Sequence, residues 1–213
     1  MLTLGRIMDA LSNMRPVFHS EADFQHALAM QLARDCPGAD IRLEYRPLSG
    51  RPVYTDIWLT FEGVHYAIEL KYKTRGAVLE VAGERFELAN HGAQDIGKHD
   101  FWKDVQRVEE VCALRDRTAG AVLFLTNDQT YWNESMRVGT CAEAFHMHEG
   151  RVATGQLSWA DHTGAGTKRK RESGVQLGGS YRVAWRDYGG GQGGLLRFRY
   201  ALLDVIAPAD FGV

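Results

Sequence analysis

The chain has 213 residues, of which 45% are hydrophobic and 10% aromatic, so it can bury the core of one globular domain. Its formal charge of −2 predicts no overall basic surface, although residues 151–213 are net positive and the rest net negative. No run approaches the roughly 18 apolar residues of a membrane helix, and the first residues, MLTLGRIMDALSNMR, are too polar for a secretory signal. We therefore expect a cytoplasmic protein that does not enter a membrane, with reduced cysteines.

Local patterns predict one helix and then three strands in the first part of the chain. Residues 20–34 begin with a helix-capping serine, Ser20, followed three residues later by an acid, and their apolar residues recur at helical spacing. Only Glu62 and Gly63 separate the last two strand-like runs, which is typical of an antiparallel hairpin. The three runs are rich in β-branched and aromatic residues and span 41–46, 53–61 and 64–73.

The middle of the chain returns to helix and then to strand. Residues 74–97 indicate a partly ordered connection, and residues 98–117 carry the strongest helical pattern in the chain. An apolar run ended by turn residues predicts a buried strand at 120–128. A helix between strands of this kind favours a mixed α/β fold with helices against a sheet.

The last part of the chain reads as an extension of the same domain. Residues 160–174 are rich in Gly, Thr, Lys and Arg, which indicates a mobile basic loop. Residues 181–205 predict a closing hairpin around a Gly-rich turn. We therefore predict one domain over residues 1–213, with its core at about 18–128 and a C-terminal extension at about 129–213.

Two acids from the predicted hairpin should be neighbours. Centring the turn on Glu62 and Gly63 pairs Phe61 with Val64 and carries Asp56 to the position opposite Glu69. The two Cβ atoms of such a pair lie about 5 Å apart, and like charges there are unfavourable. Lys71 points to the same face as Glu69, because strand side chains alternate.

A divalent cation would remove the repulsion between these two acids. Mg²⁺ prefers carboxylate oxygens and water as ligands, and an ammonium group one strand repeat away could meet a phosphate oxygen or an attacking water. The alternative is that Asp56 and Glu69 lie on a solvated face and that Lys71 merely pairs with one of them. A shift of one residue in the pairing would move Asp56 to the other face.

The order of these elements resembles the restriction-endonuclease-like PD-(D/E)XK nuclease superfamily. A helix with an acid, three strands, a helix and a strand occur in that order over roughly residues 18–128, and Asp56, Glu69 and Lys71 match the acid and the acid-x-Lys of its motif. Glu21 matches the acid that members often add from the first core helix. The proline that names the family is replaced by Thr55. The resemblance implies a mixed β-sheet core flanked by helices.

The resemblance also implies a function. A Mg²⁺-dependent phosphodiesterase would use Asp56, Glu69, Lys71 and Glu21, with Mn²⁺ as a substitute metal and the Leu70 carbonyl as a further metal ligand. DNA is the expected substrate, and cutting both strands of a duplex would suit a homodimer. The alternatives are an RNA-directed nuclease and a catalytically inactive module that binds nucleic acid or a protein partner.

Several cations and one amide are candidates for contact with nucleic acid. Asp100, Asp104 and Arg107 fall on one side of the predicted helix, adjoining its core face, with other polar residues close by. A run of four cations in the predicted basic loop could follow a phosphate backbone. In both places the alternative is an ordinary solvated surface. The candidates are Lys73, Lys103, Gln106, Arg107, Lys168, Arg169, Lys170 and Arg171.

Overall fold

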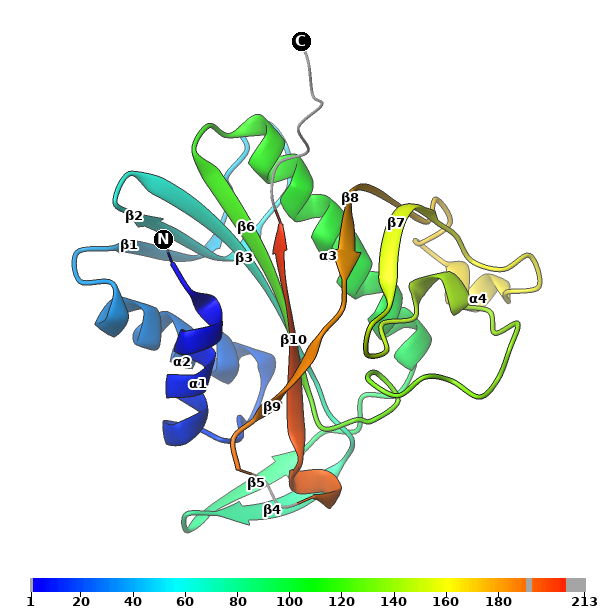
Figure 1. The fold of residues 1–213 in the computed structure, drawn as a ribbon, viewed down its shortest axis with the longest axis horizontal. Helices are drawn as coiled ribbons and strands as arrows, with labels where there is room; N and C mark the ends of the chain where they lie inside the picture. Colours follow the sequence, from blue (N-terminus) through cyan, green and yellow to red (C-terminus); the bar gives the residue numbers. More distant parts are fainter. Residues whose placement is uncertain (1, 191–192, 206–213) are drawn as a thin grey trace.

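A six-stranded sheet forms the centre of the protein, in the order β1-β2-β3-β6-β10-β9 (Figure 1). The computed structural model describes residues 2–190 and 193–205. β3 and β6 are parallel, and the other neighbouring strands are antiparallel. The strands span Asp40–Tyr45 (β1), Thr55–Phe61 (β2), Val64–Lys73 (β3), Thr118–Thr126 (β6), Trp185–Tyr188 (β9) and Phe198–Val205 (β10). The antiparallel pair of β9 and β10 confirms the predicted C-terminal hairpin.

Helices cover both faces of this sheet, which confirms the predicted α/β class (Figure 1). α1 and α2 lie on one face, while α3 lies on the other together with the small β7–β8 sheet; the β4–β5 hairpin extends from one end. The bounds are Leu4–Met14 (α1), Glu21–Asp35 (α2), Ala77–Val81 (β4), Glu84–Leu88 (β5), Gln94–Leu114 (α3), Val152–Leu157 (β7), Ala165–Lys168 (α4) and Val175–Arg182 (β8), with short 3-10 turns at Glu143–Phe145 and Gly194–Leu196. No helix in the described ranges is long and apolar enough to cross a membrane.

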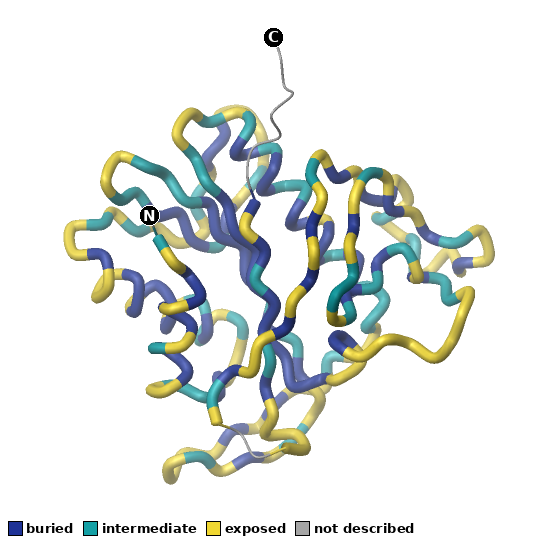
Figure 2. The backbone as a smooth tube through the Cα atoms, viewed as in Figure 1, coloured by how far each residue is buried: buried dark blue, intermediate teal, exposed yellow. Residues whose placement is uncertain are grey.

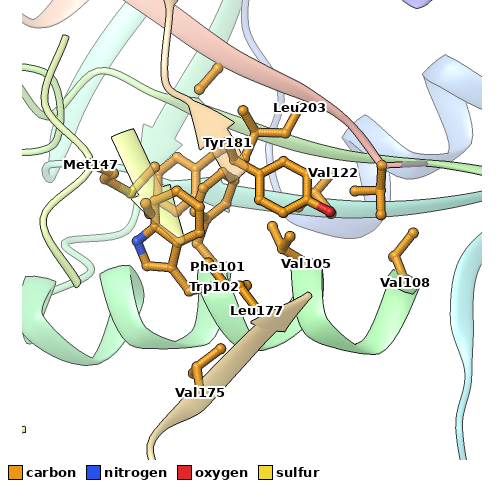
Figure 3. Packing of buried hydrophobic residues seen from close by; sticks show 14 of the residues in the cluster. Phe101, Trp102, Val105, Val108, Val122, Met147, Val175, Leu177, Tyr181 and Leu203 are labelled. Carbon is orange, nitrogen blue, oxygen red and sulfur yellow. The ribbon is translucent and has the colours of Figure 1, made fainter. Parts of the chain in front are cut away.

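Strand alternation divides the hydrophobic core into two layers. Ile68, Leu70 and Tyr72 of β3 are buried against α1 and α2, whereas Ala67 faces the α3 layer, as the alternation predicts. Figure 2 shows the buried path that follows the central strands. Figure 3 shows the α3 layer, in which the apolar side of the helix packs on β6, β8 and β10 through Phe101, Trp102, Val105, Val108, Val122, Leu177 and Leu203.

The first core helix begins as its sequence predicts. The Ser20 side chain accepts a hydrogen bond from the backbone N–H of Asp23 at 3.1 Å, and α2 starts at the next residue, Glu21. The Asp23 carboxylate turns back to accept from the N–H of His19 at 3.0 Å and pairs with Arg15 at 2.9 Å. This cap fixes the start of α2, and therefore the place of Glu21 beside the sheet.

Two stretches are more ordered than their sequences predict. Residues 74–97, expected as a partly ordered connection, contain the β4–β5 hairpin and the start of α3. The turn of this hairpin is formed by Ala82 and Gly83. Their φ angles are both positive, 51° and 80°, which suits a tight hairpin turn. Residues 160–174, expected as a mobile loop, include α4 and several hydrogen-bonded turns. Local strand pairing orders the hairpin, whereas the contact of Arg171 with the distant Asp100 holds the second stretch.

Candidate functional site

The β2–β3 hairpin has the predicted register. Phe61 pairs with Val64, and Ile57 pairs with Ile68 at the far end of the hairpin. Asp56 is the residue immediately before Ile57, next to this final pair. The Asp56 carboxylate accepts a hydrogen bond from the backbone N–H of Leu70 at 2.6 Å. The carboxylate therefore lies beside the chain that carries Glu69 and Lys71, as the sequence predicts.

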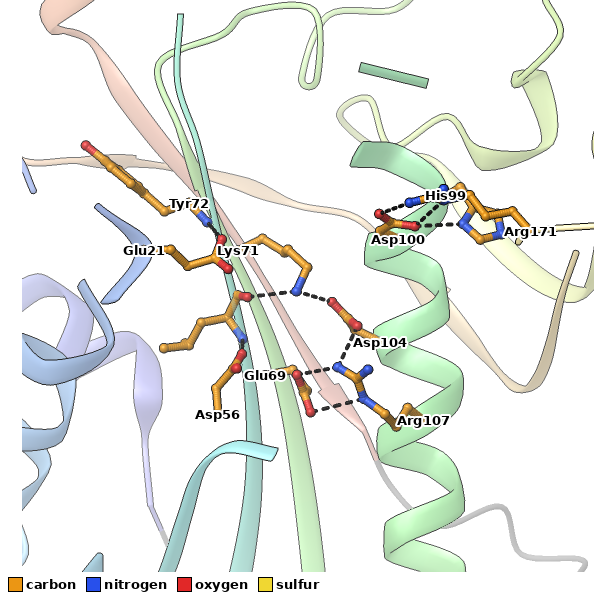
Figure 4. Close-up of polar contacts among 11 residues, drawn as sticks. Glu21, Asp56, Glu69, Lys71, Tyr72, His99, Asp100, Asp104, Arg107 and Arg171 are labelled. Carbon is orange, nitrogen blue, oxygen red and sulfur yellow. Dashed lines mark hydrogen bonds and ion pairs between the residues drawn. The ribbon is translucent and has the colours of Figure 1, made fainter. Parts of the chain in front are cut away.

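Glu69 is almost fully buried, with 1% of its side chain exposed, and faces α3 (Figure 4). Arg107 of α3 donates to both of its carboxylate oxygens, Nη2 to Oε2 at 2.6 Å and Nε to Oε1 at 3.2 Å. Burial raises the pKa of Glu69 well above its ordinary value; Arg107 opposes this shift, and the charges of Asp56 and Asp104 add to it. The Glu69 carboxylate is thus attracted by the Arg107 guanidinium and repelled by the carboxylates of Asp56 and Asp104.

Lys71 reaches from β3 to the same helix. Its Nζ lies 2.7 Å from an Asp104 carboxylate oxygen and donates to the Leu70 carbonyl at 3.1 Å. Burial acts to lower the Lys71 pKa, but the charges of Asp104 and Glu21 outweigh it and raise the pKa above its ordinary value. Lys71 is therefore a fixed cation at neutral pH, and it cannot serve there as a general base.

Glu21 reaches the site region from the first turn of α2. Its carboxylate accepts a hydrogen bond from the backbone N–H of Tyr72 at 2.7 Å, on the strand that carries Lys71. It also lines a pocket of about 260 Å³ with Lys73 and His91. Glu21 thus lies one residue along β3 from Lys71, and its charge acts on both Lys71 and Asp56.

The charges of this site do not balance. Four carboxylates and two cations form ion pairs here or act on one another's charge. The carboxylates belong to Asp56, Glu69, Asp104 and Glu21, and the cations to Lys71 and Arg107. With these six groups ionised, the carboxylates outnumber the cations by two, and the next cation, Lys73, lines the pocket beside Glu21. Burial raises the pKa of Asp56 and the charges of Asp104 and Glu21 add to this, although the Leu70 hydrogen bond and Lys71 oppose it. Ionised Asp56 is therefore unfavourable in the site as it stands.

This donor set fits a hard divalent cation. Carboxylate oxygens and a backbone carbonyl are the ligands that Mg²⁺ prefers, and two positive charges would match the excess of acid. In the part of the chain that the structure describes, no three His, Cys, Asp or Glu side chains already converge as a metal-binding group. An ion between Asp56 and Glu69 would therefore have to share Glu69 with Arg107.

The helix residues of the site differ from the role that their sequence suggests. Arg107, predicted as a phosphate contact, is turned inward to Glu69 and also donates to Asp104 at 2.7 Å. Asp104 is buried and joins Lys71 to Arg107 (Figure 4). Its position four residues after Asp100 on the same helix side was visible in the sequence, but its partner on β3 was not.

The other nucleic-acid candidates lie outside this network. Lys103 and Gln106 are on the outer side of α3, where the Nζ of Lys103 donates to Gln106 Oε1 at 3.3 Å. Lys168, Arg169 and Lys170 are at the end of α4 and in the turn after it, and Lys73 lines the pocket beside Glu21. Arg171 forms an ion pair with Asp100, with Nε 2.9 Å from Oδ1.

Asp56, Glu69 and Lys71 therefore come together on the α3 face of the sheet, with Glu21 at its edge. Arg107 and Asp104 complete the group from the helix. Neither a protein-family model nor a curated protein sequence matches the chain. The description of the site therefore rests on the structure.

Proposed function

We propose that the protein is a metal-dependent nuclease that hydrolyses phosphodiester bonds in DNA. The observation that carries the proposal is the group of Asp56, Glu69 and Lys71 on one face of the sheet, with more carboxylates than cations around it. The order α2, β1, β2, β3, α3, β6, interrupted by the β4–β5 hairpin before α3, also supports a restriction-endonuclease-like core, because these six elements follow the order expected from the resemblance. Such a core would bring the acid and the acid-x-Lys of the motif together in this way.

The chain's own groups would divide the work. Asp56 and Glu69 would hold Mg²⁺ or Mn²⁺, with the Leu70 carbonyl and Glu21 as further oxygen ligands. When bound, such an ion lowers the pKa of a coordinated water and neutralises charge on a phosphate. Asp56 is already oriented by the Leu70 N–H, so this carboxylate would need little rearrangement.

Lys71 would stabilise negative charge on the phosphate. Its raised pKa keeps the ammonium group protonated, so Lys71 would donate hydrogen bonds to a phosphate oxygen or to the attacking water and would accept no proton. Asp104 holds Nζ at 2.7 Å and is therefore a positioning residue. Arg107 opposes the effect of burial on the Glu69 pKa, but it also donates to both Glu69 carboxylate oxygens and would therefore compete with the metal for this ligand.

Substrate assays test the proposal. Purified protein would be incubated with linear, circular and single-stranded DNA and with RNA, under Mg²⁺ and under Mn²⁺. Wild-type protein should cleave DNA, and Lys71→Ala should lower the rate by about 100-fold or more, as expected for loss of a group that stabilises the transition state. A matched control is Arg85→Ala, which removes a cation from the β4–β5 hairpin. Cleavage of RNA alone would correct the substrate, and wild-type rates in Lys71→Ala would overturn the mechanism.

One observation favours a second candidate, a catalytically inactive module of the same fold that binds nucleic acid or a protein partner. Glu69 is already paired with Arg107, and Lys71 with Asp104, so both motif residues have structural partners. A module of this kind would show no Mg²⁺- or Mn²⁺-dependent rise in unfolding temperature that depends on Asp56. A nuclease would show one.

A further inference from the structure

The basic segment after β7 is fastened to α3 by one arginine. Arg171 donates to both carboxylate oxygens of Asp100, Nε to Oδ1 at 2.9 Å and Nη2 to Oδ2 at 3.1 Å (Figure 4). Its backbone carbonyl accepts a hydrogen bond from Trp159 Nε1 at 3.1 Å. Arg171 is thus held at its side chain and at its backbone, so the segment cannot move as a free loop.

Asp100 is itself prepared to hold this arginine. His99 Nδ1 lies 3.0 Å from Asp100 Oδ1, and the His99 ring is buried and stacked on Trp159 at 5.3 Å between ring centroids. Burial acts to raise the Asp100 pKa, but the hydrogen bonds from His99 and Arg171 outweigh it and hold the pKa well below its ordinary value. Asp100 is therefore ionised at neutral pH, and its pair with Arg171 is a stable fastening.

The fastening leaves the neighbouring cations outside. Arg169 and Lys170 are exposed and Lys168 is half-buried, and within the described ranges none of their three side-chain cations forms an ion pair, although the backbone N–H of Lys170 donates to the Glu172 carboxylate at 3.0 Å. Lys103 lies nearly one turn of α3 beyond Asp100 and is likewise exposed and free of such a partner. The pair of Arg171 with Asp100 therefore brings the basic segment to α3 about one helical turn from Asp104, and Lys103 lies on the neighbouring outer side of the helix.

The backbone at Lys170 lies in a tight turn. Lys170 has a φ of 66°, in the left-handed region where a lysine costs about 1 kcal/mol and a glycine does not. The turn is closed by the N–H of Arg171 donating to the Lys168 carbonyl at 2.6 Å. The N–H of Lys170 also donates to the Glu172 carboxylate at 3.0 Å, so the backbone that carries this cation is held in a defined turn.

We propose that Lys103, Lys168, Arg169 and Lys170 form a surface, the α3–α4 basic surface, that binds the phosphates of nucleic acid beside the candidate site. Arg171 acts on this surface only as a positioning residue, through Asp100. The proposal rests on the proposed function in taking nucleic acid as the partner. It adds the surface on which the nucleic acid would lie, and it names the four of the five cations that would contact the phosphates.

Binding without metal tests this surface separately from cleavage. The full-length protein would be titrated into a fluorescently labelled DNA duplex in EDTA, across a series of salt concentrations, with fluorescence anisotropy as the readout. Each of K103A, K168A, R169A and K170G should weaken binding and reduce the slope of log affinity against log salt by about 0.9. K170G relieves the strained φ, so its loss of binding should come with an unfolding temperature at or above that of the wild type.

Asp100→Asn separates positioning from simple electrostatics. The variant removes a negative charge beside the surface and frees Arg171, so electrostatics alone predicts tighter binding. Positioning predicts weaker binding, because the segment loses its fastening. It also predicts that Asp100→Asn, Arg171→Gln and the double variant lose affinity by the same factor. Tighter binding by Asp100→Asn, or additive losses, would overturn the role given to Arg171.

Control variants and alternative ligands complete the test. Arg6→Ala and Arg34→Ala remove exposed cations from α1 and α2, on the opposite face of the sheet, and should leave the salt slope unchanged. An unchanged slope in the variant that lacks all four cations would overturn the surface, as would cation-dependent binding of phosphatidylserine vesicles without binding of DNA. Binding in EDTA without cleavage in Mg²⁺ would instead reject the nuclease and leave the surface supported.

Discussion

Replacing Asp56 by Asn separates the metal-binding role of this residue from its place in the fold. The amide oxygen of Asn can still accept the hydrogen bond that the Leu70 N–H donates at 2.6 Å, so the local geometry is kept. The substitution removes one negative charge from a group in which carboxylates outnumber cations. Burial and the neighbouring acids make ionised Asp56 unfavourable, so metal-free Asp56→Asn should be as stable as the wild type or more stable.

With metal present, the same substitution should have the opposite consequence. An ion at ten times its Kd stabilises the native state by about 1.4 kcal/mol. In a chain of 213 residues, 1 kcal/mol corresponds to a change of about 2–4 °C in unfolding temperature, so Mg²⁺ should raise that of the wild type by about 3–6 °C. Asp56→Asn should lose most of this rise.

Thermal unfolding with and without MgCl₂ measures both effects. Glu80→Gln is the matched control, because it removes a carboxylate from an exposed position on β4 and should keep the full metal-dependent rise. An equal rise in Asp56→Asn and in the wild type would refute metal binding at Asp56. A metal-free Asp56→Asn protein clearly less stable than the wild type would refute the charge repulsion.

Three further results should follow from the same contacts. The raised pKa of Asp56 means that protonating this carboxyl favours the folded state. The stability advantage of metal-free Asp56→Asn over the wild type at neutral pH should therefore shrink as the pH falls towards 3.8. Unfolding measured across this pH range would contradict the reasoning if the advantage stayed constant. Arg107→Gln removes the cation that competes for Glu69 and should tighten the Mg²⁺ Kd by about tenfold, measured by thermal shift, whereas weaker binding would count against shared use of Glu69. Glu109→Ala should cost about 3 kcal/mol in urea unfolding, because this buried carboxylate accepts from Tyr181 OH at 2.6 Å and from two backbone N–H groups; a cost below 1 kcal/mol would show that β8 does not depend on it.

The hairpin part of the site could be predicted from local sequence. The turn at Glu62 and Gly63 sets the register, and strand alternation sets the faces, so the meeting of Asp56 with the Glu69 strand needed no information from elsewhere. The partners on α3 could not be predicted in this way. Which side of a helix faces which strand is decided by packing across the sheet, and the pair of Arg107 with Glu69 spans 38 positions in the chain.

The extension shows the same limit more strongly. The composition of residues 160–174 indicates a mobile loop, yet Arg171 and Asp100, 71 positions apart, fasten it to α3. The β4–β5 hairpin was missed for a different reason. Its strands are only five residues long each, and only three of their ten residues are buried, so the alternation is weak, although Ala82 and Gly83 form the turn.

The most direct test of a metal-dependent nuclease is the cleavage of DNA by purified Glu69→Gln protein in Mg²⁺. Glutamine keeps the shape of the buried side chain but removes the charge that would bind the ion. Wild-type protein and the Glu80→Gln control should cleave, and Glu69→Gln should not, while its unfolding transition stays cooperative. Cleavage by Glu69→Gln at the wild-type rate would contradict the assignment of this site.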